Sequence, residues 1–221
     1  MKKTIDEALV LRRVNYSERD RVVTMLARDS GKITLFVKGA RAQKSRLSGG
    51  IELLNINEIG FMDGKSGMRT LTSSRIVVAN ENIVTDINRT NLIFENYKLL
   101  NKIIEDDHGQ ELYEIVKTYL LFMNDLGFNY VWNEVWFRLK LLQILGLVSE
   151  LKADDSDAES YSFDWEDQTF IAREEGVFSR NDIKFLRLQS MAGKPAKLTK
   201  DLGTEESILN FTHLLLENNI A

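Results

Sequence analysis

The spacing of apolar residues changes near residue 80, and no single type of secondary structure accounts for both sides of that point. Before it, apolar and polar residues alternate in short runs separated by glycines and polar turns, which is typical of β-strands. After it, apolar residues recur every three or four positions, which is typical of amphipathic helices. The pattern therefore predicts an α+β protein with an N-terminal all-β part and a helical body.

Before residue 80 the sequence predicts five strands, at 4–14, 21–27, 32–38, 51–61 and 68–78. So short a sheet would expose its edges unless it closed on itself, so we predict a five-stranded OB-fold barrel. A bulge is expected in the fourth strand, near Asn55 and Asn57. In the third strand, Ile33, Leu35 and Val37 should share one face, opposite Lys32, Thr34, Phe36 and Lys38. In the fifth, the residues expected on one face are Arg69, Leu71, Ser73 and Arg75.

After residue 80 the spacing predicts helices at 90–105, 111–126 and 131–145, the third apolar on nearly all sides and therefore central. A small hairpin is expected next, then a helix at 181–190 capped by Ser179, and a last helix at 205–217. An acidic stretch at 154–159 should form an exposed loop. The predicted domains are an OB-fold nucleic-acid-binding domain, 1–80, and an α-helical domain, 81–221. The second contains a helical bundle, 88–150, the hairpin, 160–176, and C-terminal helices, 180–218.

Composition excludes several classes of protein. Apolar residues make up 43% of the chain and charged residues 28%, which suits a globular protein with a packed core. The absence of cysteine excludes disulfides and thiolate metal sites. No apolar run is long enough for a signal peptide or a membrane-spanning helix, so we expect a cytoplasmic protein without a membrane partner.

Charge is segregated along the chain. Residues 1–80 carry a balance of +7 and residues 81–221 a balance of −11, although the whole chain has a net charge of −4. The third strand leads into a loop that contains Arg41, Lys44 and Arg46 and no acidic residue. We expect no hydrophobic driving force to hold such a loop down, and its natural partner is a polyanion.

We find no pattern that indicates catalysis. His108 and His213 lack neighbours at a ligand-like spacing, and Gly64-Lys-Ser66 lacks both the upstream glycine and the following helix of a phosphate-binding loop. Asp155, Asp157, Glu159 and Glu166 fall at positions 1, 3, 5 and 12 of a calcium loop, but position 6 is Ser160 and not the glycine that the bend requires. The sequence therefore predicts no catalytic residues, no metal, no cofactor and no enzymatic activity.

The N-terminal motifs resemble RecO, a family of bacterial recombination mediators. The resemblance is carried by Ala8-Leu-Val-Leu-Arg12, Tyr16-Ser-Glu-Arg-Asp-Arg-Val-Val-Thr-Met-Leu26, Gly31-Lys-Ile-Thr34 and Val37-Lys-Gly-Ala-Arg41. Further along, Phe137–Gly146 is similar to the central helix of the family, and Phe170-Ile-Ala172 lies where the family has a small hairpin.

This resemblance implies an OB-fold, binding to single- and double-stranded DNA, annealing of complementary strands, and action at the nucleoid. It also implies partnership with RecR and single-strand-binding protein in loading RecA, which would be an indirect partner. Many members carry a four-cysteine zinc site at the hairpin, which this chain lacks. The hairpin is expected to be held instead by packing of Phe163, Trp165 and Phe170.

On this hypothesis, cationic side chains neutralise phosphates without reading bases, and aromatic side chains stack on bases. Tyr16 and Phe36 are the stacking candidates, although Phe36 could equally cover the barrel against the helical body. The alternative is a protein-interaction adaptor whose basic barrel binds acidic peptide tails, with DNA contact incidental. The predicted DNA-binding residues are Arg13, Arg19, Lys38, Arg41, Lys44, Arg46, Lys65, Arg69 and Arg75.

Overall fold

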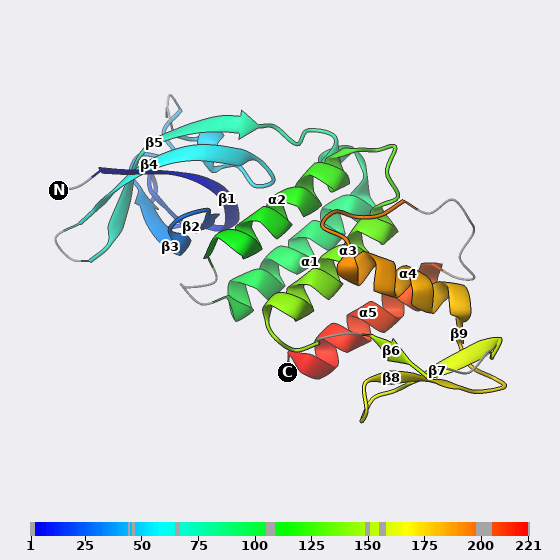
Figure 1. Ribbon diagram of the computed structural model, residues 1–221. Helices are drawn as coiled ribbons and strands as arrows, with labels where there is room; N and C mark the ends of the chain where they lie inside the picture. Colours follow the sequence, from blue (N-terminus) through cyan, green and yellow to red (C-terminus); the bar gives the residue numbers. More distant parts are fainter. Residues whose placement is uncertain are drawn as a thin grey trace. The chain divides into compact units, whose positions relative to one another are not determined.

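A computed structural model describes residues 3–43, 45, 47–64, 67–104, 109–148, 151–154, 158–197 and 205–220. The chain divides into two compact units, Met1–Leu126 and Gly127–Ala221. The first holds the strands of the N-terminal part and two helices, and the second holds three helices and a small sheet (Figure 1). The α+β class is confirmed. The functional division at residue 80 stays a prediction, because compactness alone does not test it.

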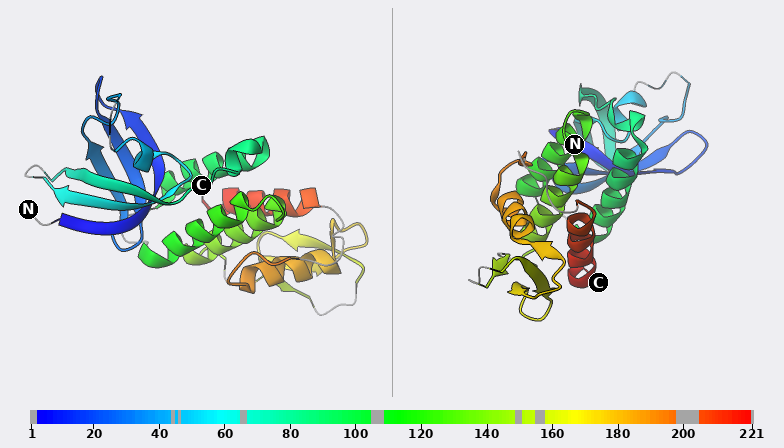
Figure 2. Two further views of the ribbon diagram at one scale, coloured as in Figure 1. Left: turned by 90° about the horizontal axis from the view of Figure 1, so that it is seen from above. Right: turned by 90° about the vertical axis from the view of Figure 1, so that its right-hand side faces the viewer.

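The N-terminal sheet closes into a barrel in the order β1-β2-β3-β5-β4. Neighbouring strands are antiparallel except β3 and β5, which run parallel and pair at Leu35 with Arg69 and at Phe36 with Thr70. This order is that of an OB-fold, and Figure 2 shows the strands curving around a common interior. The strands are β1 (Lys3–Asn15), β2 (Arg21–Ala27), β3 (Gly31–Val37), β4 (Ile56–Asp63) and β5 (Arg69–Val78).

Alternation along the strands fills the interior of the barrel. On β3 the inward side chains Ile33, Leu35 and Val37 are buried in the core, as predicted, whereas Thr34 and Lys38 are exposed. Gly31 begins the strand with φ at 65°, a left-handed conformation that suits glycine at the tight turn from β2. The remaining core residues include Ala8, Val10, Val23, Met25, Ile59, Phe61 and Leu71.

Two details of the barrel differ from the prediction. β4 begins at Ile56 rather than at Ile51, because Gly49–Ile51 forms a short 3-10 helix whose Ile51 is fully buried in the core. The expected bulge is present, as a register shift between Ile56 and Asn57. A second shift against β5 places Leu71 inside and Ser73 outside, so the predicted common face of β5 is wrong. The sequence does not reveal this bulge, since Thr and Ser fit either face.

Two helices of the first unit are tied to the barrel by polar contacts. Lys32 Nζ donates to the carbonyls of Asn101 (2.6 Å) and Ile104 (3.0 Å) at the end of α1. Glu7 on β1 accepts from Lys117 Nζ (2.6 Å) and from the Tyr113 hydroxyl (2.8 Å) on α2. The helices are α1 (Ile87–Ile103), which follows a short 3-10 helix (Ile83–Thr85), and α2 (Gly109–Asn124).

The second unit is built around α3 (Tyr130–Ile144), which packs against α4 (Arg180–Met191) and α5 (Glu205–Asn219). α3 is buried over most of its length, as predicted, and its buried Arg138 donates to Glu134 at 2.7 Å. Ser179 caps α4, also as predicted, in a reciprocal capping box with Asp182. The three helices of the predicted bundle fall in different units, with α1 and α2 in the first and α3 in the second.

The predicted hairpin is present as β7 (Ser160–Asp164) and β8 (Thr169–Ala172). It belongs to a four-stranded sheet of order β6-β8-β7-β9, whose outer strands are β6 (Lys152–Ala153) and β9 (Phe178–Ser179). The acidic stretch is not wholly a loop, because Asp154 continues from β6 and its carboxylate accepts from the amide of Ala172 at 2.9 Å. Residues 155–157 lie outside the described part of the chain.

Aromatic packing anchors this small sheet. Phe163 lies edge-on to Trp165 and Phe170, with ring centroids 5.0 Å apart in both pairs, as the sequence predicted. Two further rings complete the cluster: Phe178 of β9 and Phe211 of α5. The sheet is therefore attached to α5 through a core of five rings, which the sequence could not show because Phe211 is about 40 residues away.

Candidate nucleic-acid interface

Two motifs that are 19 residues apart in sequence meet at Asp20. One Asp20 carboxylate oxygen accepts from the amide of Gly39 at 2.8 Å, and the other accepts from the Ser17 hydroxyl at 3.1 Å. The backbone carbonyl of Asp20 accepts from the amide of Tyr16 at 3.0 Å. The loop between β1 and β2 and the turn after β3 are thus joined into one rigid surface.

Arg41 strengthens the same junction. Its amide donates to the carbonyl of Arg19 at 2.9 Å, and its guanidinium donates to the carbonyl of Ser17 at 2.9 Å. Gly39 has φ at 67°, which turns the chain sharply enough to bring Arg41 back against the β1–β2 loop. The result is three exposed cationic residues, Arg19, Lys38 and Arg41, held together at one end of the barrel. We call these three residues the basic cluster.

The two stacking candidates lie beside each other near the basic cluster. The rings of Tyr16 and Phe36 are perpendicular, with centroids 5.5 Å apart. Tyr16 is 66% exposed, and Phe36 is half-buried on the outer face of β3. Phe36 therefore packs against an exposed tyrosine, so a ring surface lies next to cationic side chains, as single-stranded nucleic acid requires.

The other predicted DNA-binding residues do not belong to the basic cluster. Arg69 lies beside Leu35 of β3, with its guanidinium 5.8 Å from the Phe61 ring and its Nε 3.3 Å from Asp63. Arg13 and Arg75 form ion pairs with Glu52 (2.5 Å) and Glu58 (3.2 Å), so acidic side chains offset their charge. Lys44, Arg46 and Lys65 lie outside the described residues.

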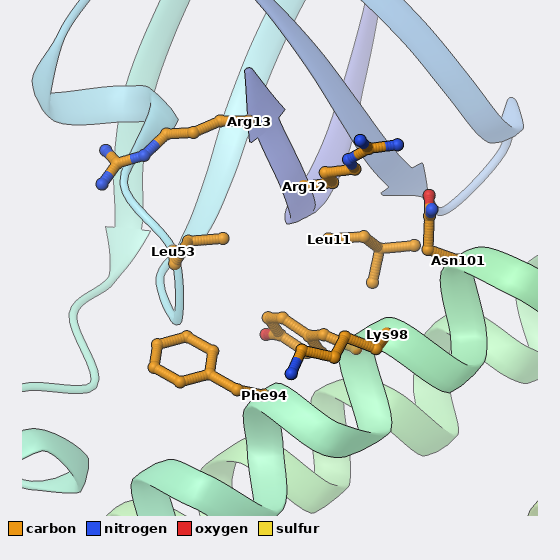
Figure 3. Close-up of a pocket in the computed structure, with 8 residues that line it drawn as sticks. Leu11, Arg12, Arg13, Leu53, Phe94, Lys98 and Asn101 are labelled. Carbon is orange, nitrogen blue, oxygen red and sulfur yellow. The ribbon is translucent and has the colours of Figure 1, made fainter. Parts of the chain in front are cut away.

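Sequence reasoning did not identify a pocket where β1 lies over α1 (Figure 3). Its volume is about 590 Å³. Leu11 and Leu53 face Phe94 across it, and Arg12 and Lys98 line it from β1 and from α1. Arg12 could have been noticed beside Arg13, but nothing in the sequence indicates that α1 faces β1 through Phe94 and Lys98.

The described residues contain no group of three or more His, Cys, Asp or Glu side chains that could hold a metal ion. His213 is exposed on α5, with Glu217 one turn away at 3.3 Å, and His108 lies outside the described part. Within that part, no helix has the length and apolar character needed to cross a membrane.

Comparisons with known proteins repeatedly find one family. Residues 1–79 match the family described as "Recombination protein O N terminal". A DNA repair protein RecO from Halalkalibacterium halodurans is 30% identical over 146 residues, which are 66% of this chain and 57% of that protein. A protein of the same name from Heliobacterium modesticaldum is 32% identical over 66% of this chain and 52% of its own length. One from Listeria monocytogenes is 30% identical over 64% of this chain and 55% of its own length.

The barrel and the match over residues 1–79 define an OB-fold protein with a recombination-protein-O N terminus. Over residues 1–79 the chain matches the RecO family, and over about two thirds of its length it is similar to curated RecO proteins. It matches a little over half the length of these curated relatives.

Proposed function

We propose that this protein acts in recombinational DNA repair as a DNA-binding mediator without catalysis of its own. It would bind single- and double-stranded DNA through the barrel and anneal complementary strands. With RecR it would help load RecA onto DNA covered by single-strand-binding protein, at the nucleoid. The observation that carries the proposal is the joined surface of Tyr16, Arg19, Lys38 and Arg41 at one end of the OB-fold.

The chemistry of this surface suits a nucleic-acid backbone. Guanidinium and ammonium groups bind phosphates, and contacts of this kind carry no sequence information. Loops between the first two strands and the faces of strands 2 and 3 are where OB-folds commonly bind oligonucleotides. Because hydrogen bonds already hold the two loops, little conformational entropy is lost when a strand binds.

The alternative is that the same basic cluster binds an acidic peptide tail, and that DNA contact is incidental. Both ligands are polyanions, so charge alone does not distinguish them. The Tyr16–Phe36 ring pair favours nucleic acid, because every base offers a face for stacking whereas an acidic tail need not carry a ring.

A double charge reversal, Lys38→Glu with Arg41→Glu, tests the proposal. Binding of a labelled single strand, measured by fluorescence anisotropy across a salt series, should weaken equally for all sequences. The slope of log K against log salt should fall by about 1.4, because each lost phosphate contact contributes about 0.7 on single strands. The matched control is Arg173→Glu with Lys194→Glu, two exposed residues of the second unit.

The control has the same net charge as the test variant, so it separates a local contact from general repulsion. If both variants weaken binding equally, the barrel surface is not the binding site. If single-strand binding survives the Lys38 and Arg41 reversals while binding of an acidic peptide is lost, the adaptor alternative replaces the proposal.

A further inference from the structure

We propose that the pocket between β1 and α1 takes one unstacked nucleotide of a bound single strand, with its base in the apolar interior and its phosphate at Arg12 and Lys98. This inference rests on the proposed DNA-binding function and extends it to a second site on the first unit. The volume of the pocket, about 590 Å³, falls within the range of small-ligand pockets.

The interior of the pocket suits a flat ring. Leu11 is 5% exposed, and with Leu53 it forms the side of the pocket that belongs to the barrel. Phe94 projects from α1 on the opposite side and offers a ring surface (Figure 3). A base inserted between these side chains would bury apolar area and stack on Phe94.

The charge of the lining side chains suits a phosphate. Arg12 and Lys98 are exposed, and within the described residues neither has an ion-pair partner. Arg13 also lines the pocket, but its guanidinium is paired with Glu52. The uncompensated charge of the lining is therefore positive, which favours an anionic ligand.

A buried polar atom at the pocket gives a separate indication of a ligand. Tyr97 lines the pocket and is 2% exposed. Its hydroxyl finds no hydrogen-bond partner in the part of the chain that the structure describes. Buried hydroxyls are normally paired, so an unpaired one in a pocket wall points to a missing partner. The edge of a base carries donors and acceptors that could supply it.

The pocket lies on the same outer face of the barrel as the Tyr16–Phe36 pair. Strand pairing places Val14, Val22 and Phe36 in one cross-strand row. The next row on this face is Arg12, Thr24 and Thr34, of which Thr24 is half-buried. Neither row contains an acidic residue. Tyr16 follows Arg12 by four positions, just beyond the end of β1, which is about 13 Å along an extended chain, so one bound strand of a few nucleotides could reach both.

An acidic peptide with one aromatic side chain would match the same interior and the same charge. The continuous acid-free face between the pocket and the Tyr16–Phe36 pair favours a nucleic-acid strand, since a strand would use both sites at once. The peptide is therefore the outcome that a direct test has to separate from DNA.

The test compares Lys98→Glu with Lys102→Glu, both on α1 and both exposed, of which only Lys98 lines the pocket. Each is titrated against an oligothymidine of about 6 nucleotides, enough for the barrel edge, and one of about 20. For Lys98→Glu we expect about a tenfold loss on the longer strand and less than twofold on the shorter. The salt slope on the longer strand should fall by about 0.7 relative to Lys102→Glu.

Phe94→Ala is the second variant, because it removes the ring without changing the charge. It should also weaken the longer strand about tenfold, with the fold checked by circular dichroism. Equal effects of Lys98→Glu and Lys102→Glu would overturn the inference. The inference would also be overturned if the pocket variants no longer bound an acidic peptide that contains phenylalanine but bound DNA as the wild type does.

The Lys38→Glu and Arg41→Glu double variant keeps this inference separate from the proposed function. If the double variant weakens both strand lengths and the pocket variants weaken neither, DNA binding by the barrel stands and the pocket inference fails. If only the pocket variants weaken the longer strand, the pocket is a DNA site and the basic cluster is not. Wild-type protein that binds neither strand would overturn both.

Discussion

Replacing Asp20 by alanine should weaken DNA binding, although the substitution removes a negative charge from a positive surface. The carboxylate accepts from the Gly39 amide at 2.8 Å and from the Ser17 hydroxyl at 3.1 Å, and alanine offers neither acceptor. Simple electrostatics predicts the opposite effect, because loss of an acid favours a polyanion by up to about 1 kcal/mol in water. The two arguments therefore differ in sign.

The magnitude follows from the order that Asp20 imposes. Two hydrogen bonds to a half-exposed carboxylate should contribute about 1–2 kcal/mol to stability, which corresponds to a melting temperature lower by about 2–8 °C. Without these hydrogen bonds, we expect DNA binding to have to fix the backbone of about one residue of the junction, which would cost about 1–2 kcal/mol of conformational entropy. Relative to a variant that loses the same charge elsewhere on the barrel, the dissociation constant for a single strand should then be about tenfold higher.

Asp29→Ala provides the matched control. Asp29 is an exposed acid in the turn between β2 and β3 of the same barrel, so its removal changes the charge equally but leaves the junction intact. It should bind DNA as tightly as the wild type or slightly more tightly. Fluorescence anisotropy at one fixed salt concentration compares the two. If Asp20→Ala binds as tightly as Asp29→Ala, order at the junction does not contribute and the reasoning is refuted.

Three further predictions concern stability. Gly50→Ala should lower the unfolding free energy by about 1–3 kcal/mol in urea, because a Cβ there would lie 2.0 Å from Ser74 Oγ and 3.0 Å from Ser74 backbone carbon; an unchanged midpoint would contradict this. Burial would raise the pKa of Glu7, but hydrogen bonds from Lys117 and Tyr113 outweigh it and hold that pKa below 4.5. Glu7 therefore stabilises the fold above pH 4.5, and this contribution is lost as the pH falls through the folded pKa of Glu7. In the Glu7→Gln variant the melting temperature should depend less on pH in that range. Phe170→Ala should cost about 3–5 kcal/mol in chemical unfolding, because a fully buried ring at the centre of the five-ring cluster is lost.

Each of these has its own control or contrary result. For Glu7, a Gln variant that retains the full acid dependence of the wild type would show that another carboxylate is responsible. For Phe170, the comparison is Trp165→Ala, which removes a larger ring that is 43% exposed and should cost less. Equal losses in the two variants would mean that burial in the cluster does not decide the energy.

Much of the fold could be predicted because its signals are local. The alternation of apolar residues predicted the bounds of β2 as observed. The helical spacing of apolar residues after residue 80 predicted the bounds of α1, α2 and α3 to within a few residues. Ser179 was recognised as a cap from its position before a helical pattern, and the structure adds the reciprocal bond, in which the Asp182 carboxylate accepts from the Ser179 amide. Such features depend on neighbours within a few residues, so the sequence contains what decides them.

The misplaced features depend on contacts between distant segments. β4 begins late because Ile51 enters the barrel core on a 3-10 helix, and Ser74 Oγ donates to the Gly50 carbonyl at 2.6 Å. The predicted common face of β5 was wrong because of a bulge. There the register against β4, and not the residue type, decides the direction of a side chain.

The sequence by itself determined the α+β class and the five strands of the barrel, and it located the basic residues of the N-terminal part. Only the tertiary structure decided which of those residues lie together. Asp20 joins two loops through long-range hydrogen bonds, Glu52 and Glu58 offset Arg13 and Arg75, and a pocket forms where α1 meets β1. The physical reason is that periodicity reports local backbone preference, whereas charge pairing and pockets depend on distances between segments that only folding sets.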